Sequence, residues 1–455
     1  MQTSALASFI ANLSYDSLPK DVVDAAKAAY LDWLGSALAG SDKKPTTILT
    51  KVVKEMGGHP EATLIGDGSQ TTAAHAALLN GASSHVVELD DVHKASVLHA
   101  GAVVIPAALA VCEKKGKSGK SLIAAIVAGY EVGIRVGEAV TPSHYRKWHT
   151  TGTCGTFGAA AAAAKALDLN EEQCLSTLGS AGTQAAGLWE FIEDGAMSKH
   201  LHPGKAAFNG VLSALLAGNG YTAATRIIEG KRGFCAATAP EYDLNKITDG
   251  LGEDFKIREN CYKIYSSCRH THHVIDIIRD LKERYRLIPD QVQKIKVNTY
   301  SAALDITGKF NPSSVYGAKF SLPFCAALAL VYGKAGLEEF SEANLCNPEI
   351  TRFMSQVELN IQPEMNEAYP QKWPASVEIR LTDGNIIRGE TDYPKGDPEN
   401  PLSKEELVEK FASLVKPYIF PEDIKQLVEI IFNMEEVADL KLVLPRRLKN
   451  RLPAE

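Results

Sequence analysis

The chain has 455 residues, of which 45% are hydrophobic and 23% are charged, and its formal net charge is -7 at pH 7. Length and composition together predict a globular protein of two or three domains. The acidic balance and the lack of a basic stretch argue against nucleic acid as a partner. We therefore expect the protein to act on a small molecule.

The cysteines and the apolar segments bear on where the protein works. The eight cysteines are scattered and form no Cys-x-x-Cys pair, which is typical of reduced thiols in an intracellular protein. The first twenty residues lack the basic and apolar regions of a signal peptide, and Pro106, Glu131 and Arg135 interrupt the longest apolar runs. We expect a cytoplasmic protein that makes no contact with a membrane.

The first half of the chain has the pattern of closely packed helices. Residues 20–40 follow Pro19, end at Gly40 and place apolar side chains at helical spacing. Similar Ala-, Leu- and Gly-rich helical patterns occupy residues 71–89, 102–116, 121–140 and 155–169. No fixed-period repeat is present, so these segments predict a helical bundle rather than a solenoid.

The pattern changes to alternating apolar and polar residues after about residue 255. Three segments with this period predict strands, and Thr382–Asn385 between two apolar runs predicts a hairpin turn. The predicted strands lie in residues 291–304, 355–364 and 375–390, and helices are expected in residues 272–287 and 324–336. A Pro- and Gly-rich linker is expected in residues 393–403, and helical patterns return in residues 405–416 and 424–435.

These patterns predict a mainly α protein. Both chain ends, residues 1–258 and 396–455, are expected to form a large all-helical bundle domain. Residues 259–395 are expected to form a smaller α+β lid domain.

Ten of the twelve histidines fall in four short segments, at residues 85–99, 144–149, 200–202 and 270–273. Asp, Lys, Arg or Cys residues lie within or directly beside each segment, so together the segments could form one polar cleft between the domains. In the first segment, an Asp paired with a His would supply an oriented acid or base, because a carboxylate fixes the imidazole tautomer. A polar helix end at the surface is the plain alternative, and no compact spacing of metal ligands is present.

The other three segments suggest sites for anions. His149 precedes a Gly- and Thr-rich helix start that could hold a carboxylate, although the glycine spacing is not that of a dinucleotide site. Lys199 could bind a carboxylate, and Arg269 could clamp one with two parallel hydrogen bonds. The alternatives are tight helix packing, solvated lysines, and a zinc site at Cys268, His270 and His272 that lacks a fourth ligand at a normal interval.

The four segments resemble a known family. ELDDVH with His99-Ala-Gly-Ala, WHTTGTCGTFGAAAAAAK, GLWEFIEDGAMSKHLHPGKAAFNG and the CRHTH element, in this order, are similar to the MmgE/PrpD family over about residues 5 to 395. The resemblance implies a large helical domain with a small α+β lid, a homodimer, and a site between the domains. Members include 2-methylcitrate dehydratase, cis-aconitate decarboxylase and iminodisuccinate epimerase, which act on small polycarboxylates without metal or organic cofactor.

By position, the resemblance also implies functional residues. The catalytic candidates are Asp91, His99, His149, Lys199 and Lys263. The candidates for substrate binding are Asp90, His93, His202, Cys268, Arg269 and His272, and no metal ligand is expected.

All three family reactions build negative charge at a carbon next to carboxylates, so each needs cations and a proton donor or acceptor. Lys199, Lys263 and Arg269 suit the carboxylates, and His99, oriented by Asp91, and His149 suit proton transfer. We therefore expect a cofactor-free lyase of a small di- or tricarboxylate. An epimerase or isomerase of a dicarboxylate such as iminodisuccinate, and a noncatalytic carboxylate-binding protein, remain alternatives.

Overall fold

A computed structural model describes residues 1–445 and 447–449 of the chain. The chain divides into two compact units: Met1–Asn260 with the described residues from Ser403 onward, and Cys261–Leu402. The structure is mainly α, as predicted. None of the described helices combines the length and the apolar character that a bilayer crossing requires.

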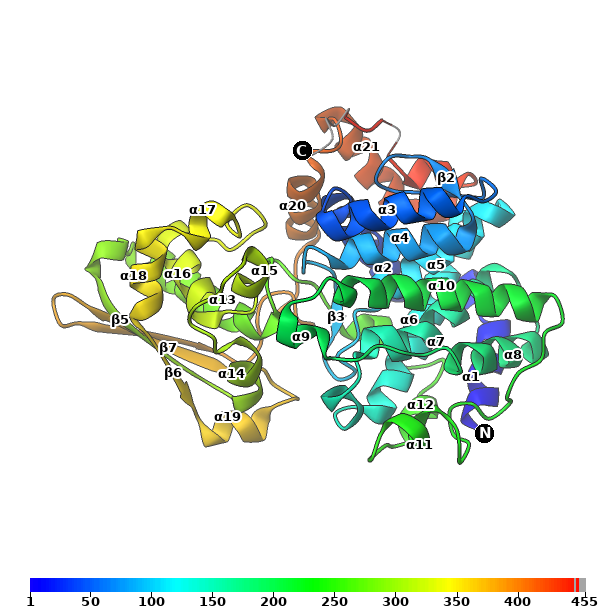
Figure 1. The fold of residues 1–455 in the computed structure, drawn as a ribbon, viewed down its shortest axis with the longest axis horizontal. Helices are drawn as coiled ribbons and strands as arrows, with labels where there is room; N and C mark the ends of the chain where they lie inside the picture. Colours follow the sequence, from blue (N-terminus) through cyan, green and yellow to red (C-terminus); the bar gives the residue numbers. More distant parts are fainter. Residues whose placement is uncertain (446, 450–455) are drawn as a thin grey trace. The chain divides into compact units, whose positions relative to one another are not determined.

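Most of the first unit consists of helices (Figure 1). They are α1 (Gln2–Asn12), α2 (Lys20–Gly40), α3 (Lys44–Met56), α4 (Ala73–His85), α5 (Ala100–Lys115), α6 (Gly119–Val140), α7 (Thr150–Ala166), α8 (Glu171–Gly182), α9 (Phe191–Asp194), α10 (Ser198–Gly218), α11 (Phe234–Thr238), α12 (Asn245–Thr248), α20 (Lys404–Val415) and α21 (Pro421–Phe432). The predicted helix at residues 20–40 is confirmed as α2. The two helices near the C-terminus, α20 and α21, pack against α2 near the N-terminus.

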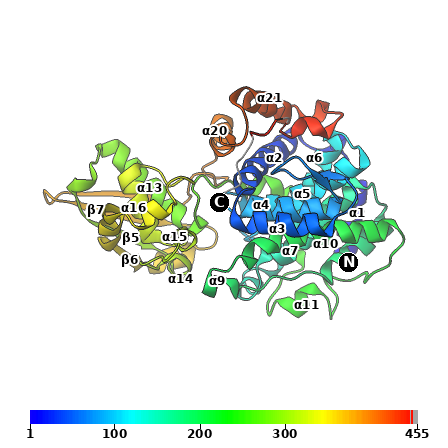
Figure 2. The same cartoon turned by 45° about the horizontal axis from the view of Figure 1, so that its top comes forward.

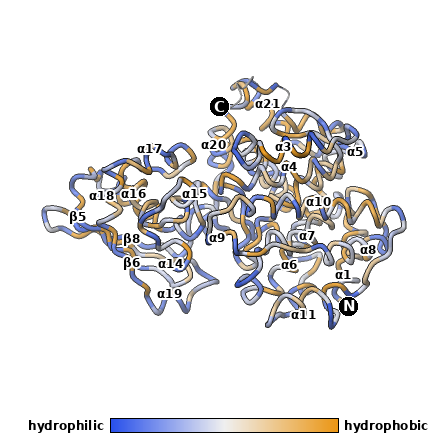
Figure 3. Tube along the Cα trace, in the orientation of Figure 1, coloured by the Kyte–Doolittle hydropathy of each residue, from blue (hydrophilic) through white to orange (hydrophobic). Residues whose placement is uncertain are grey.

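Small side chains let the central helices approach closely. Helix α7 packs against α5, α6 and α10, and α4 packs against α2, α5 and α10 (Figure 2). The six alanines Ala159–Ala164 on α7 are all fully buried. Figure 3 shows hydrophobic residues along the helices of this interior and hydrophilic residues in many of its connecting loops. The core therefore depends on close backbone contact as well as on large side chains.

The first unit is not entirely helical, which corrects the sequence-based expectation. Two-residue strands β1 (Ala62–Thr63) and β2 (Gln70–Thr71) pair antiparallel between α3 and α4. Two further short strands are β3 (Val92–His93) and β4 (Asn260–Cys261). Strands this short bury too little apolar surface to show a period of two in the sequence.

The second unit contains a four-stranded sheet of order β6-β5-β7-β8. The strands are β5 (Val292–Thr299), β6 (Val357–Ile361), β7 (Ala375–Leu381) and β8 (Ile386–Thr391), and the helices are α13 (His272–Tyr285), α14 (Ser301–Thr307), α15 (Val315–Ala318), α16 (Leu322–Tyr332), α17 (Glu342–Leu345), α18 (Pro348–Ser355) and α19 (Pro363–Ala368). Strands β5 and β6 are parallel, and the β5–β7 and β7–β8 pairs are antiparallel. The predicted hairpin is confirmed, because Thr382–Asn385 joins β7 to β8.

The core of the second unit lies between α13, α16 and the sheet. Ile277 and Leu281 of α13 face Gly389 of β8, and Val297 and Ile379 are buried on the sheet. The predicted linker passage differs from expectation, because residues 396–402 belong to this unit and Asp397 is fully buried in it. That this unit acts as a lid remains a prediction.

Replacing Gly210 of α10 with alanine should destabilise the first unit. An added Cβ would lie 2.5 Å from the backbone nitrogen of Ala160 on α7, and backbone cannot move aside as a flexible side chain can. We expect the free energy of unfolding to fall by about 1–3 kcal/mol in urea titrations. Gly218→Ala on the same helix is the matched control, because its nearest neighbour is 3.4 Å away. Equal stability of the two variants would contradict the close approach of α7 and α10.

Candidate active site

The loop between α4 and α5 carries the first group of polar residues. The sequence predicted a helix up to residue 89, but α4 ends at His85. Glu88 has φ 59° and Val97 has φ 49°, which is the left-handed region that side chains with a Cβ seldom adopt. The helix prediction is therefore wrong after His85, and a strained loop presents these residues instead.

Two imidazole rings meet the carboxylate of Asp90. His85 Nδ1 lies 2.6 Å from Asp90 Oδ2, and His99 Nδ1 lies 3.2 Å from the same oxygen. The side chains of His85 and Asp90 are buried, and the side chain of His99 is 13% exposed. The two rings stand edge to face with centroids 4.8 Å apart. Asp90 therefore joins the end of α4 to the start of α5.

The contacts of His99 define its tautomer. Its Nδ1 also lies 2.7 Å from the backbone carbonyl oxygen of Asp91. A carbonyl oxygen only accepts hydrogen bonds, so Nδ1 carries the proton and Nε2 is the basic atom of the neutral ring. The sequence expected the Asp91 carboxylate to orient His99, and this is wrong. The orienting groups are the Asp91 carbonyl and the Asp90 carboxylate.

The carboxylate of Asp91 is bonded elsewhere. Its Oδ1 accepts from the backbone N–H of Gly101 at 3.0 Å, and its Oδ2 accepts from the Tyr130 hydroxyl at 2.5 Å and from the Asn260 amide at 2.8 Å. Tyr130 lies on α6, so Asp91 fixes the loop to two helices. This arrangement positions the carbonyl oxygen that holds His99.

Asp91 titrates far from the usual range of a carboxyl. Burial and the negative charge of Asp32 raise its pKa to about 7. The charge of Asp90 acts in the same direction, and the hydrogen bonds from Tyr130 and Asn260 act against it. A buried carboxyl of this kind can hold or release a proton near neutral pH.

The start of α7 anchors the loop. The Thr150 hydroxyl donates to the Val97 carbonyl at 2.5 Å, and the backbone N–H of His99 donates to the Thr151 hydroxyl at 3.2 Å. The Thr153 hydroxyl lies 2.8 Å from His144 Nε2. These contacts engage the hydroxyls of Thr150 and Thr153, whereas the Thr151 hydroxyl accepts a hydrogen bond and keeps its own donor. The carboxylate cradle at this helix start stays a prediction.

His149 and His202 form a second pair of rings. Their Nδ1 atoms are 3.1 Å apart, so one ring donates and the other accepts. Trp189 packs on His149 with ring centroids 5.0 Å apart. Burial, with the charges of His85 and Lys199, holds the pKa of His149 well below its usual range and lowers that of His202 to about 4. Both rings are therefore neutral at physiological pH.

His85, a member of the first pair of rings, connects that pair to the second. Its ring centroid is 5.7 Å from that of His149 and 6.4 Å from that of His200. Four predicted residues of this unit, with His85, thus form one histidine–carboxylate cluster: Asp90, His99, His149 and His202.

Lys199, at the start of α10, forms a buried ion pair with Glu88. Solvated lysines were one alternative for this segment, but Lys199 is only 4% exposed. Lys199 and His202 lie three residues apart on one face of α10, which places Lys199 beside the cluster. Its charge acts on both His149 and His202. The pairing of Lys199 with Glu88 was not predicted from the sequence.

The ring nitrogens of His93 contact residues outside the histidine–carboxylate cluster. His93 Nδ1 contacts Ser96 at 3.0 Å, and Nε2 lies 3.2 Å from a carboxylate oxygen of Glu259. Lys256 pairs with the same glutamate and with Glu138. These contacts favour a structural role for His93 over the predicted role in substrate binding.

In the second unit, Arg269 is bonded within the unit. Its guanidinium pairs with Asp397 and donates to the Lys395 carbonyl at 3.1 Å and to His272 Nδ1 at 2.9 Å. A cation at the start of a helix is unfavourable unless an anion lies beside it, and Asp397 supplies that anion. The predicted double hydrogen bond from Arg269 to a substrate does not fit this geometry.

The other candidates of the second unit are buried or partly buried. His272 Nε2 donates to the Ser267 carbonyl at 3.3 Å, so both its ring nitrogens are engaged, and burial keeps its pKa well below the usual range. Cys268 is partly exposed, and Lys263 is 1% exposed and lies close enough to His272 to lower its pKa. The nitrogen contacts of His272 do not suit the zinc alternative.

Two groups of side chains have the spacing of possible metal ligands. Among the described residues, His85, Asp90 and His99 place three ligand-type atoms within 4.8 Å of one another, as do His93 and its two glutamates. In the first group both Nδ1 atoms carry protons that are shared with Asp90, and hydrogen bonding accounts for these short distances. In the second group the ammonium of Lys256 already occupies the position between the carboxylates.

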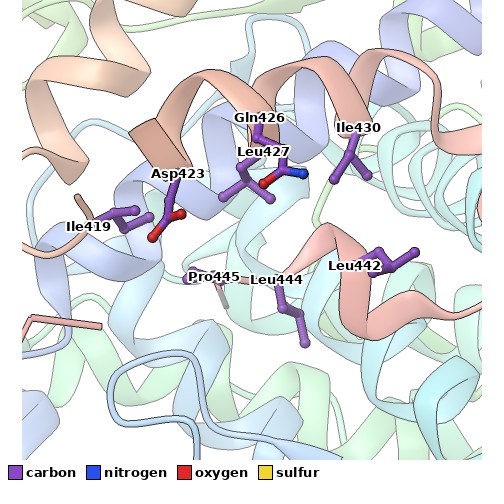
Figure 4. A pocket seen from close by; sticks show the side chains of 8 residues that line it. All are labelled: Ile419, Asp423, Gln426, Leu427, Ile430, Leu442, Leu444 and Pro445. Carbon is purple, nitrogen blue, oxygen red and sulfur yellow. The ribbon is translucent and has the colours of Figure 1, made fainter. Parts of the chain in front are cut away.

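A small cavity near the C-terminal helices is separate from this cluster (Figure 4). Its volume is about 10 Å³, and Leu427 and Ile430 of α21 face Leu442 and Leu444 across it. Its one carboxylate, on Asp423, is bonded to Arg447. The cavity is too small for a polycarboxylate.

Comparison with known proteins identifies the family. The model of the MmgE/PrpD N-terminal domain matches residues 4–246, and that of the C-terminal domain matches residues 265–435. The chain belongs to the MmgE/PrpD family, as its sequence motifs indicated. The relatives described below are named as cis-aconitate decarboxylases or as decarboxylase-like, and these names support a lyase rather than the isomerase alternative.

Three relatives align over nearly the whole chain. A cis-aconitate decarboxylase of Aspergillus terreus is 28% identical over 97% of this chain and 95% of its own length. The cis-aconitate decarboxylase-like protein oryM of Aspergillus oryzae is 27% identical over 97% and 96%. The human cis-aconitate decarboxylase is 25% identical over 100% and 95%.

Asp91→Asn should change how stability depends on pH. The folded pKa of Asp91, about 7, lies above its ordinary value of 3.8, so only the folded state holds this proton between about pH 4 and 7. The resulting stabilisation is present at low pH and is lost as the pH rises through this window. The stability of the wild-type protein relative to Asp91→Asn should fall by up to about 1.4 kcal/mol per pH unit there.

Urea unfolding between pH 4 and 8.5 measures this difference. Asp16→Asn, at a side chain that is 89% exposed, is the control and should run parallel to the wild type. Parallel curves for Asp91→Asn would show that the folded carboxyl titrates normally.

Proposed function

We propose that this protein is a cofactor-free lyase of a small di- or tricarboxylate, and that decarboxylation of cis-aconitate is the first activity to test. The observation that carries the proposal is the histidine–carboxylate cluster, in which a carbonyl and a carboxylate orient the partly buried His99. A ring oriented in this way is suited to proton transfer at carbon, and Lys199 is the proposed cation beside the cluster. The names of the relatives favour decarboxylation over the other reactions of the family.

The proposed decarboxylation has two parts: stabilisation of the negative charge left by the departing CO₂, and transfer of a proton to carbon. In decarboxylation the bond between carbon and the departing CO₂ breaks, and its electron pair is delocalised over the adjacent double bond and carboxylate. A proton from an imidazolium then forms the new C–H bond, which leaves a neutral ring. Asp90 stabilises the charged form of His99 before this step, because its carboxylate lies 3.2 Å from Nδ1.

Dehydration of a 2-methylcitrate-like substrate would use the same groups in another order. A neutral ring removes a proton from carbon, and a protonated group donates to the departing hydroxyl. His99 and His149 are the proposed pair for these two transfers. Lys199 and, in the second unit, Lys263 are the proposed partners of the substrate carboxylates.

Purified protein incubated with cis-aconitate in deuterated buffer should release CO₂ and place one deuterium on carbon in the product. His99→Gln and His149→Gln should each lower kcat/KM by roughly 10²–10⁴-fold, the usual contribution of a general acid or base. Mass spectrometry and proton NMR follow the product. The control is His75→Gln on α4, where the half-buried ring stacks on Phe208 away from the proposed groups.

A panel of 2-methylcitrate and aspartate-derived dicarboxylates would separate the alternatives. Water loss indicates a dehydratase, and deuterium exchange without loss of a group indicates an epimerase. Thermal stabilisation by these ligands with no turnover or exchange would support the noncatalytic alternative against our proposal. Activity that dialysis against a chelator removes would contradict the cofactor-free mechanism.

A further inference from the structure

The ion pair between Glu88 and Lys199 joins two segments that are 111 residues apart. Glu88 is 2% exposed and Lys199 is 4% exposed, so both charges are held out of water. Removing two charges from water is costly, and an apolar pair of similar volume often serves a fold equally well. The needs of folding alone therefore do not explain this pair.

The backbone conformation of Glu88 also indicates a functional role. Its φ of 59° places a long side chain in the left-handed region, which is unfavourable for a residue other than glycine. Strain of this kind persists where the surrounding structure holds a functional arrangement in place. The strained position lies two residues before Asp90, on the loop that forms the histidine–carboxylate cluster.

The charge of Lys199 acts on this cluster. Lys199 and His202 lie three residues apart on one face of α10, so the ammonium group lies near the cluster. Its charge disfavours protonation of both His149 and His202. A buried lysine without a neighbouring negative charge tends to lose its proton. A carboxylate beside Lys199 therefore keeps the lysine protonated, so that a cation is present at this position.

We propose that Glu88 is the positioning residue of Lys199, which keeps this lysine protonated and directed at the histidine–carboxylate cluster until a substrate carboxylate shares the ammonium group. The proposal rests on the proposed function, since it assigns Lys199 a substrate carboxylate. An ammonium group has three donors, so it can hold Glu88 and a substrate oxygen together. The Glu88 carboxylate also partly neutralises the positive charge that Lys199 presents to the substrate.

Several other titratable groups face this pair, and they enter any dependence on pH. They are His85 on α4, Asp90 and Asp91 on the loop, His99 before α5, His149 before α7, His200 and His202 on α10, and Asp32 on α2 with Lys410 on α20. Lys410 bonds to Asp32 and to the carbonyl of Leu89, next to Glu88. The experiment must therefore observe Lys199 itself.

The test is Glu88→Gln, which keeps the shape and removes the charge. NMR of protein labelled with ¹³C and ¹⁵N in lysine side chains follows the titration of Lys199, assigned through Lys199→Arg. We expect Lys199 in Glu88→Gln to lose its proton roughly 1–3 pH units lower than in the wild type, the usual effect of one neighbouring opposite charge. The alkaline limb of kcat/KM should move down with it, mainly through a higher KM.

Glu131→Gln is the matched control. Glu131 also forms a buried ion pair in the first unit, with Arg135 at 2.6 Å, but it has no part in the proposed site. This variant should leave both the Lys199 titration and the alkaline limb unchanged. A loss of activity of equal size at every pH in Glu88→Gln, with Lys199 titrating as in the wild type, would overturn the proposal.

Glu88→Asp covers the case in which Glu88→Gln does not fold. The aspartate keeps the negative charge, but its side chain is one methylene group shorter, so the carboxylate lies farther from Lys199. We expect kcat/KM to fall while Lys199 stays protonated near neutral pH. Unchanged kcat/KM in Glu88→Asp would show that the position of the carboxylate is irrelevant. Should the wild type turn over no polycarboxylate, the proposed function fails, and the lysine titration alone then decides the role of Glu88.

Discussion

The carboxylate of Asp90, shared by His85 and His99, is the contact on which the candidate site depends. It joins the last residue of α4 to the residue before α5, and the loop between them carries the other acidic groups. Because a carboxylate accepts but does not donate when charged, both rings must present Nδ1–H to it. One acidic side chain thereby sets the direction of two imidazoles.

The close packing of the helices makes this contact rigid. Asp91 bonds to the start of α5 and to Tyr130 of α6, and Thr150 and Thr151 of α7 bond to the same loop. A strained loop requires such support, since left-handed backbone at Glu88 and Val97 is unfavourable by itself. The small residues that bring the helices together thus also hold the loop in place.

The sequence predicted much of this molecule where the signal was local. The helix at residues 20–40 and the hairpin at Thr382–Asn385 were found because start, stop and turn residues act over a few positions. The pairing of Lys199 with Glu88 joins residues far apart, so no spacing reveals it. The end of α4 was missed because VVEL continues an apolar pattern and nothing local marks the left-handed turn at Glu88.

The sequence also did not reveal the partners of the charged side chains. Sequence reasoning assigned Lys199 and Arg269 to substrate carboxylates because cations suit anions, but each pairs with a carboxylate of its own unit. The two pairs differ in what surrounds them. Arg269 is tied to backbone carbonyls and to a ring with both nitrogens engaged, whereas the charge of Lys199 acts on two neutral histidines beside an oriented acid–base group. Of these two cations, Lys199 is therefore the one that we propose shares its ammonium group between Glu88 and a ligand, and Arg269 instead fixes the passage around Asp397.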